Sequence, residues 1–117
     1  MQVIHLPEEF ENSNDIWESV NETEMFEATK IETSQIFKEV NNIKIEKGYL
    51  KNNNAYIVSL NHKVYSGTRS FKYLVKQVKC LKNGKLYQIT FTMPDEYFND
   101  TMSILFTRVI DSFLFMP

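Results

Sequence analysis

The sequence has few of the residues that hold very small or metal-dependent domains together. Cys80 is its only cysteine, which excludes an internal disulfide and any multi-cysteine metal site. Its three glycines, Gly48, Gly67 and Gly84, each fall at a predicted turn, so no glycine-rich phosphate loop is present. No apolar run approaches the roughly 20 residues that span a bilayer. The first residues also lack the pattern of a signal peptide.

Acidic residues are missing from the middle of the chain. The formal net charge is −2, and eleven of the fifteen acids lie in residues 1–46, with only Lys30, Lys38 and Lys44 as cations there. Residues 47–94 contain no acid and nine cations: Lys47, Lys51, Lys63, Arg69, Lys72, Lys76, Lys79, Lys82 and Lys85. Such an asymmetry predicts either a binding face or two segments that neutralise each other.

What is present is enough for one packed domain. The chain has 117 residues, of which 43% are hydrophobic and 14% aromatic. These values are ordinary for a globule with a single core, so we expect one domain over residues 1–117. The free thiol is typical of a reducing cytosol. A mature protein whose leader had been removed would look the same, which leaves cytoplasmic and extracytoplasmic locations open.

Four stretches alternate between apolar and polar residues: 43–49, 56–64, 71–81 and 87–93. This alternation is typical of β-strands, and the third stretch is apolar on both sides, as in a central strand. Turn residues separate the stretches, and Asn83-Gly84 is a strong type I′ hairpin signal. Pro94, which lacks a backbone N–H, ends the last strand. The sequence predicts a four-stranded antiparallel meander.

A long amphipathic helix is predicted after Pro94. Its apolar stripe consists of Phe98, Met102, Leu105, Val109 and Phe113, widened by Phe106 and Ile110. Asp95 or Asn99 can cap its first turn.

The first 42 residues are less regular. Val3 to Leu6 predict a short strand that Pro7 stops. Asn14 or Asp15 can cap a short helix carrying Ile16, Trp17 and Val20. Residues 25–31 fit either a strand or a helix. A second short helix is predicted to start at Thr33 or Ser34 and to carry Ile36, Phe37 and Val40.

Together these elements give an α+β fold. We expect a twisted antiparallel sheet, made of the meander and an N-terminal strand. A long C-terminal helix and shorter N-terminal helices would cover it.

This order of elements, with its punctuation, resembles the PsbP-like family, which includes the photosystem II subunit, bacterial relatives and Mog-type import factors. The segments that carry the resemblance are Gly48-Tyr49, Asn54-Ala55-Tyr56-Ile57-Val58, Asn83-Gly84-Lys85-Leu86-Tyr87, Tyr97-Phe98, Val109-Ile110-Asp111-Ser112-Phe113 and Leu6-Pro7-Glu8. The resemblance implies an α/β/α sandwich and a non-catalytic protein that binds other proteins. It supplies no functional residues for this chain, and residues 1–42 follow it only loosely.

The residues that could perform chemistry do not form a recognisable site. His5 and His62 are far apart and have no ligand-spaced neighbours, so His62 is expected to be a half-buried strand residue. Cys80 shares its side of the strand with Leu74 and Val78, which predicts a small core residue. The carboxylates lie in a solvated acidic segment. We therefore expect no enzyme activity, no cofactor and no metal.

The lysine-rich strands are the one feature that suggests a function. The candidate partner-binding residues are Lys72, Lys76, Lys79, Lys82, Lys85, Tyr73 and Tyr87. They could form a binding face for an acidic partner, fill the solvent face of the sheet, or be covered by the acidic N-terminal segment. The first reading predicts a protein-binding or assembly-factor domain, with another protein preferred as partner. The alternative is a small-ligand or nucleic-acid binding module that uses the basic, tyrosine-bearing face.

Overall fold

A computed structural model of the chain describes residues 2–6, 13–97 and 99–112. Its centre is a five-stranded antiparallel sheet in the order β1-β5-β4-β3-β2. The strands are β1 (Gln2–His5), β2 (Lys38–Leu50), β3 (Asn53–Ser66), β4 (Arg69–Lys82) and β5 (Lys85–Pro94). The predicted meander and the predicted N-terminal strand are both confirmed, since β1 pairs with the outer edge of β5. The strand predicted to be central, β4, lies in the middle of the sheet.

Three of the predicted turns form, whereas Gly48, which was also expected at a turn, lies within β2 opposite Ala55. Asn83 and Gly84 both have positive φ, 51° and 73°, as a type I′ turn requires. Lys51 and Asn52, which join β2 to β3, also have positive φ. The β3–β4 turn uses Gly67 with φ of 63°, and no atom approaches the position of a Cβ there. Backbone conformation therefore explains this glycine.

The first helix is also as predicted. In α1 (Ile16–Ser19) the side chain of Asp15 accepts a hydrogen bond from the backbone N–H of Trp17 at 3.0 Å. Ile16 is buried, and the indole N–H of Trp17 donates to the carbonyl of Ala55 at 2.8 Å. The hydroxyl of Tyr56 donates to the carbonyl of Val20. These contacts fix α1 to the start of β3.

The next segment settles one open prediction and corrects another. Helix α2 spans Glu22–Ile36, with Asn21 as its cap, so the ambiguous residues 25–31 are helical. Thr33 and Ser34 lie in its last turns and begin no second helix. The buried residues of α2 are Met25, Thr29 and Thr33. Two of these three are polar, and a helix with such a stripe gives almost no periodic apolar signal in the sequence.

Strand β2 begins at Lys38, five residues before the predicted start at Ile43. Its first part is irregular, with shifts of register between Lys38 and Lys44. Glu39 and Asn42 have positive φ, 49° and 55°. These irregularities remove the alternation of apolar and polar residues from which a strand is predicted.

The C-terminal helix is shorter and differently rotated than predicted. Helix α3 spans Asp100–Asp111, follows a 3₁₀ turn (η2, Asp95–Tyr97), and is capped by Asn99, whose side chain accepts from Met102 N at 3.0 Å. It buries Phe106 and Ile110. Leu105 and Val109, expected in the buried stripe, are 45% and 42% exposed. The stripe was too broad to fix a single face, and Phe98 and Phe113 lie outside the described residues.

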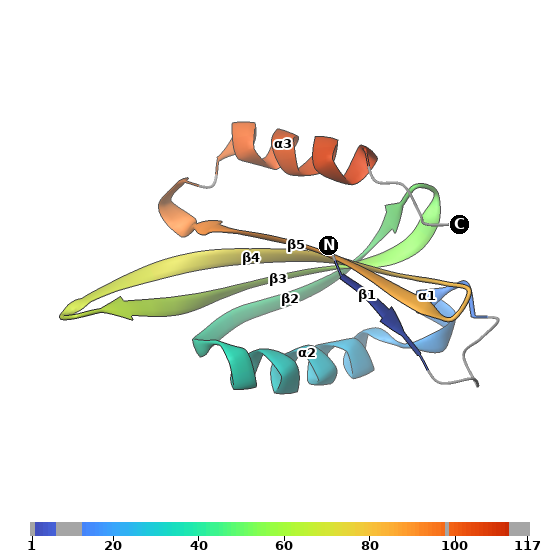
Figure 1. The fold of residues 1–117 in the computed structure, drawn as a ribbon, viewed down its shortest axis with the longest axis horizontal. Coiled ribbons are helices and arrows are strands. Elements are labelled where there is room, and N and C mark those ends of the chain that lie inside the picture. Colours follow the sequence, from blue (N-terminus) through green and yellow to red (C-terminus); the bar gives the residue numbers. More distant parts are fainter. Residues whose placement is uncertain (1, 7–12, 98, 113–117) are drawn as a thin grey trace.

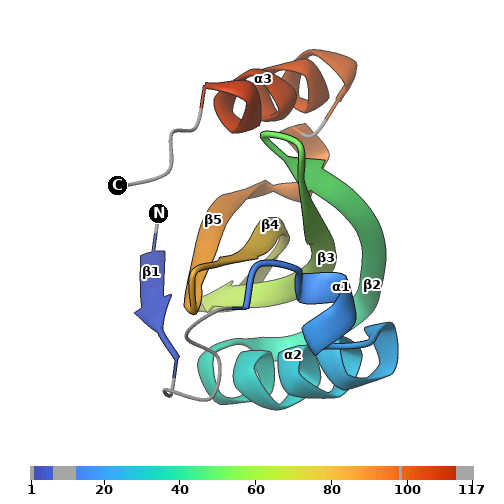
Figure 2. The same ribbon diagram turned by 90° about the vertical axis from the view of Figure 1, so that its right-hand side faces the viewer.

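Figures 1 and 2 show α3 along one face of the sheet and α1 and α2 along the other. We call these the α3 face and the α2 face. On the α3 face, Phe106 and Ile110 pack with Leu50, Val78, Cys80, Tyr87 and Ile89. On the α2 face, Ile16 and Met25 pack with Tyr56, Val58 and Leu81. Among the described residues no helix is long and apolar enough to cross a membrane.

Candidate binding surface

The seven residues named as binding candidates are divided between the two faces. Residues directly opposite each other in antiparallel strands point to the same side. Lys79 lies opposite Tyr56 and Tyr73 opposite His62, which places both on the α2 face. The other five share the α3 face with Cys80, and they are Lys72, Lys76, Lys82, Lys85 and Tyr87. No single surface contains the whole set.

Several of them are also covered. Tyr87 is 2% exposed and lies in the apolar cluster under α3. The ammonium of Lys76 lies 5.6 Å from the centre of the Phe106 ring of α3, in a cation–π arrangement. Lys82 and Lys85 face each other beside the Asn83-Gly84 turn, at the other end of β4 from Lys72.

Lys79 is the most buried of the lysines. The residue is 4% exposed, and its ammonium lies 3.5 Å from the carboxylate of Glu32 on α2. This ion pair is a contact between the acidic N-terminal segment and the basic sheet, as the third reading of the lysines expects. It takes Lys79 out of any surface that a partner could touch.

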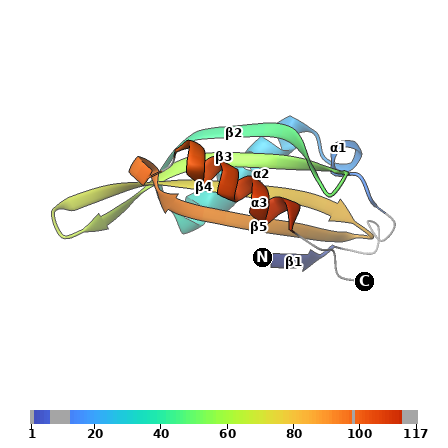
Figure 3. The same ribbon diagram turned by 90° about the horizontal axis from the view of Figure 1, so that it is seen from above.

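The structure instead presents a surface that the sequence reasoning missed. Pairing between β2 and β3 begins at Lys38 opposite Lys63, and pairing between β4 and β5 ends at Tyr73 opposite Pro94. Beyond these pairs, residues 64–72 continue as a two-stranded hairpin that projects from the sheet (Figure 3). We call residues 64–72 the ribbon.

The ribbon exposes apolar side chains and carries only positive charge. Val64, Tyr65 and Phe71 are 40%, 49% and 43% exposed. Val64 lies directly opposite Phe71, and Ser66 opposite Arg69. Arg69 and Lys72 are its charged residues. The sequence contained a signal for the ribbon. Pairing that starts at the Asn83-Gly84 turn places Pro94 opposite Tyr73. Because Pro94 ends β5, the residues of β4 before Tyr73 have no partner in β5.

A concavity of about 420 Å³ lies where the ribbon leaves β2. We call it the β3 shoulder. Its lining is apolar and basic, and consists of Ile36, Phe37, Lys38, His62, Lys63, Val64 and Tyr65. Ile36, at the end of α2, is 66% exposed. The end of α2 and the open edge of β3 therefore form its two sides.

His62 forms the floor of this shoulder. Its ring stacks on Phe37 with centroids 4.1 Å apart and lies 5.8 Å from the ring of Tyr73. The residue is 6% exposed, and its Nε2 atom has no hydrogen-bond partner among the described residues. Burial lowers the pKa of His62 below its usual value, which favours the neutral ring. The prediction of a half-buried histidine thus understated its burial.

The carboxylate of Glu39 links two residues of the β3 shoulder, Tyr65 and Lys63. Glu39, in the irregular part of β2, accepts a hydrogen bond from the hydroxyl of Tyr65 and lies 3.7 Å from the ammonium of Lys63. This hydrogen bond raises the pKa of Tyr65. The side chains of Lys63 and Glu39 are 45% and 52% exposed, so this pair is accessible to solvent.

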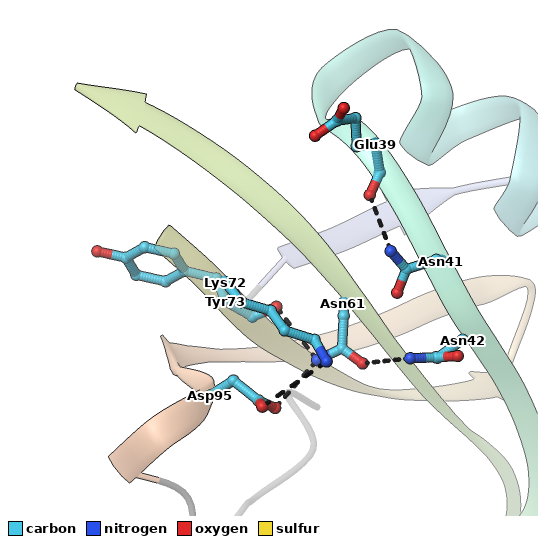
Figure 4. Close-up of polar contacts among 7 residues, drawn as sticks. All are labelled: Glu39, Asn41, Asn42, Asn61, Lys72, Tyr73 and Asp95. Atoms are coloured by element: carbon cyan, nitrogen blue, oxygen red, sulfur yellow. Dashed lines mark hydrogen bonds and ion pairs between the residues drawn. The ribbon is translucent and has the colours of Figure 1, made fainter. Parts of the chain in front are cut away.

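The opposite side of the ribbon base differs in charge. Here a concavity of about 210 Å³, the β4 shoulder, is lined by Ser70, Phe71, Lys72, Pro94, Asp95 and Glu96. Asp95 lies 4.0 Å from the ammonium of Lys72 and accepts from the side-chain amide of Asn61 at 3.1 Å (Figure 4). Asn42 in turn donates to Asn61 at 3.2 Å. This network ties β2, β3 and η2 together and explains the burial of Asn61.

The thiol is placed as predicted. Cys80 is fully buried in the cluster under α3, and burial raises its pKa to about 11. A thiol with this pKa is protonated at neutral pH and is a poor nucleophile. Within the described residues, no group of three or more histidine, cysteine or acidic side chains is arranged to hold a metal ion.

Comparisons with protein-family models, with curated proteins and with solved structures find no match to this chain.

Proposed function

We propose that this chain is a non-catalytic protein-binding domain whose main contact element is the ribbon. The observation that carries the proposal is the exposure of Val64, Tyr65 and Phe71 on a hairpin that extends past both neighbouring strands. Large side chains on a projecting element offer area that becomes buried only when a partner binds. A role as an assembly factor is one form of such binding.

The fold itself supports a binding role of this kind. We propose an α/β/α sandwich of the PsbP-like type, in which the helices on the two faces stiffen the sheet and the ribbon projects from it. The positions of α3 and of α1 with α2 in Figure 1 support this arrangement. A rigid base reduces the conformational entropy lost when the ribbon contacts a partner.

Absence of catalysis is part of the same proposal. The two groups best suited to chemistry are both buried: Cys80 carries a raised pKa, and His62 has stacked aromatic rings on either side. Within residues 2–6, 13–97 and 99–112, neither has the hydrogen-bonded base or orienting carboxylate that a nucleophile or general base needs. These features support a binding rather than an enzymatic function.

Site-specific photo-crosslinking tests the proposal. A benzoyl-phenylalanine residue would replace Tyr65 in the ribbon or, as a control, Ile104 on the outer side of α3, which is 56% exposed. We expect Tyr65 to capture a discrete protein in the native cells, and Ile104 not to capture it. With that partner purified, the Val64→Ser/Phe71→Ser double variant should bind at least tenfold more weakly, and Ile104→Ser equally well. Equal binding by the ribbon variant would overturn the proposal.

The alternative of nucleic-acid binding loses two of its seven residues, since Lys79 and Tyr87 are buried. Retention of a labelled single-stranded DNA that falls steeply with salt would restore it.

A further inference from the structure

The β3 shoulder has the features of a site for a short extended peptide. Pairing of β2 with β3 begins at Lys63, so the outer edge of residues 64–66 has no neighbouring strand among the described residues. An open strand edge can accept an added strand through backbone hydrogen bonds. The concavity beside this edge, about 420 Å³, is wide enough for one large apolar side chain. Ile36, Phe37 and Val64 supply apolar walls for it.

Charge distinguishes this shoulder from its counterpart. Lys38 and Lys63 line the β3 shoulder, and Arg69 lies at the tip of the ribbon, where no described carboxylate pairs with it. The β4 shoulder is lined by Asp95 and Glu96, with Lys72 held by Asp95. An acidic segment is therefore attracted to the first shoulder and repelled from the second.

The protein's own Glu39 indicates which chemical group the β3 shoulder recognises. Its carboxylate already accepts from Tyr65 and contacts Lys63, so these two side chains form a carboxylate-binding pair. Glu39 holds them from a left-handed backbone conformation, with φ of 49°, in the irregular start of β2. A solvent-exposed ion pair of this kind contributes little free energy, which allows an incoming carboxylate to replace it.

We infer that the β3 shoulder binds a short acidic segment of a partner protein, with one apolar side chain in the concavity and a carboxylate on Lys63 and Tyr65. The segment lies along the open edge of residues 64–66, and its carboxylate displaces Glu39. This inference rests on the proposed protein-binding function and names the chemistry of the partner.

A phage-displayed library of random 12-residue peptides provides the test. We expect selection on the wild-type protein to enrich peptides with several Asp or Glu residues around a Leu, Phe or Trp. Enrichment of neutral or basic peptides, or no enrichment over a Val64→Ser/Lys63→Glu variant, would overturn the inference. The proposed function would survive that result if Tyr65 still crosslinked to a partner, so the two failures are distinguishable.

Fluorescence anisotropy with the most enriched peptide, labelled with fluorescein, then locates the site. Lys63→Glu should weaken binding at least tenfold, because it reverses the charge that the peptide contacts. Glu39→Gln should strengthen binding about threefold, because it removes the competing carboxylate. Lys51→Glu is the matched control. It makes the same charge change on an exposed lysine in the β2–β3 turn, at the opposite end of β3 from the ribbon, and should leave affinity unchanged.

Two results would contradict the assignment. Equal losses in Lys51→Glu and Lys63→Glu would mean that net charge, and no particular site, attracts the peptide. A wild-type dimer in sedimentation experiments that dissociates in Lys63→Glu would assign the shoulder to a second copy of this chain, whose residues 1–46 contain eleven acids.

Discussion

Helix α3 presents Phe106 and Ile110 to one face of the sheet, whereas α2 presents Met25, Thr29 and Thr33 to the other. The sheet residues that pack with Phe106 and Ile110 include Val78, Cys80 and Ile89, which are buried in one apolar cluster. The α2 face includes the buried polar residues Gln77, Lys79 and Gln88. Burying apolar surface contributes free energy wherever it occurs, while a buried polar group contributes only when it is hydrogen-bonded.

The difference shows that two helices can cover one sheet by different physical means. The attachment of α3 depends on area, so its stability should fall with every carbon atom removed. The attachment of α2 combines the ion pair of Glu32 with Lys79 and the apolar contact of Met25 with buried polar groups such as Thr29, so single substitutions there should have effects of either sign. Four changes test this comparison, in order of decreasing effect.

The largest effect is expected from Phe106→Ala. Phe106 is 8% exposed and packs edge-to-face on Phe91, with centroids 5.6 Å apart. Its truncation should lower the free energy of unfolding by about 3–4 kcal/mol, measured by urea denaturation. Ile104→Ala on the exposed side of the same helix is the control and should cost less than about 1 kcal/mol. Similar losses for both would mean that α3 does not hold the sheet through Phe106.

A change of charge on the α2 face should have the next largest effect. Glu32→Gln leaves the ammonium of Lys79 without its carboxylate, and the side chain of Lys79 is only 5% exposed. We expect a loss of about 1–2 kcal/mol, below the full cost of a broken buried pair because Glu32 is itself half-exposed. Adding Lys79→Met should restore most of it. A double variant as unstable as Glu32→Gln alone would exclude this ion pair as the cause.

Removal of a buried hydroxyl should have the opposite sign. The Oγ1 atom of Thr29 is buried, and no group in the described part of the chain forms a hydrogen bond with it. Thr29→Val keeps the shape and should raise the free energy of unfolding by about 1 kcal/mol. Thr33→Val is the matched control, since Thr33 Oγ1 donates to the carbonyl of Thr29 at 2.7 Å. It should be neutral or slightly destabilising. The same gain in both variants would show that valine, and not the removed hydroxyl, stabilises the helix.

The smallest effect concerns pH. Burial lowers the pKa of His62, so below the usual value of about 6.5 the unfolded chain binds a proton that the folded protein resists. The stability due to neutral His62 is fully present above about pH 6.5. It is lost as the pH falls from there through the lowered pKa of His62 in the folded protein. Unfolding measured at pH 7.5 and 5.5 should therefore change less in His62→Gln than in wild type. His5→Gln, at an exposed site, should behave as wild type.

Prediction from the sequence succeeded where local chemistry decides the structure. Asn83-Gly84 defines its turn because both residues tolerate positive φ. Asp15 caps α1 because its side chain accepts from the free backbone N–H of Trp17. Cys80 is buried because it lies in a central strand, on the same side as Val78. Prediction failed where the apolar periodicity was weak or extended over too much of a helix. The Met25, Thr29 and Thr33 stripe carries little apolar periodicity, and the seven apolar positions of the predicted C-terminal helix did not single out Phe106 and Ile110.

The candidate site shows the same limit. Alternation can place Lys72 and Lys76 on the same side of β4, but it cannot say that α3 covers one and Asp95 holds the other. Lys79, on the opposite parity, was grouped with them although the sheet separates them. The β3 shoulder brings together Ile36, Lys63 and Tyr65 from distant parts of the chain, and no spacing rule relates these positions.

Local patterns in the sequence are sufficient to predict the five strands, most of their turns, one core cysteine and the separation of acidic from basic residues. Each of these depends on neighbours within a few positions, where backbone preference and alternation act directly. The tertiary structure was needed to show that β3 extends past β2, that α2 covers Lys79, and that Glu39 reaches Tyr65 and Lys63. These depend on how far each strand pairs and on which side chains distant segments bring together, quantities that no local pattern contains.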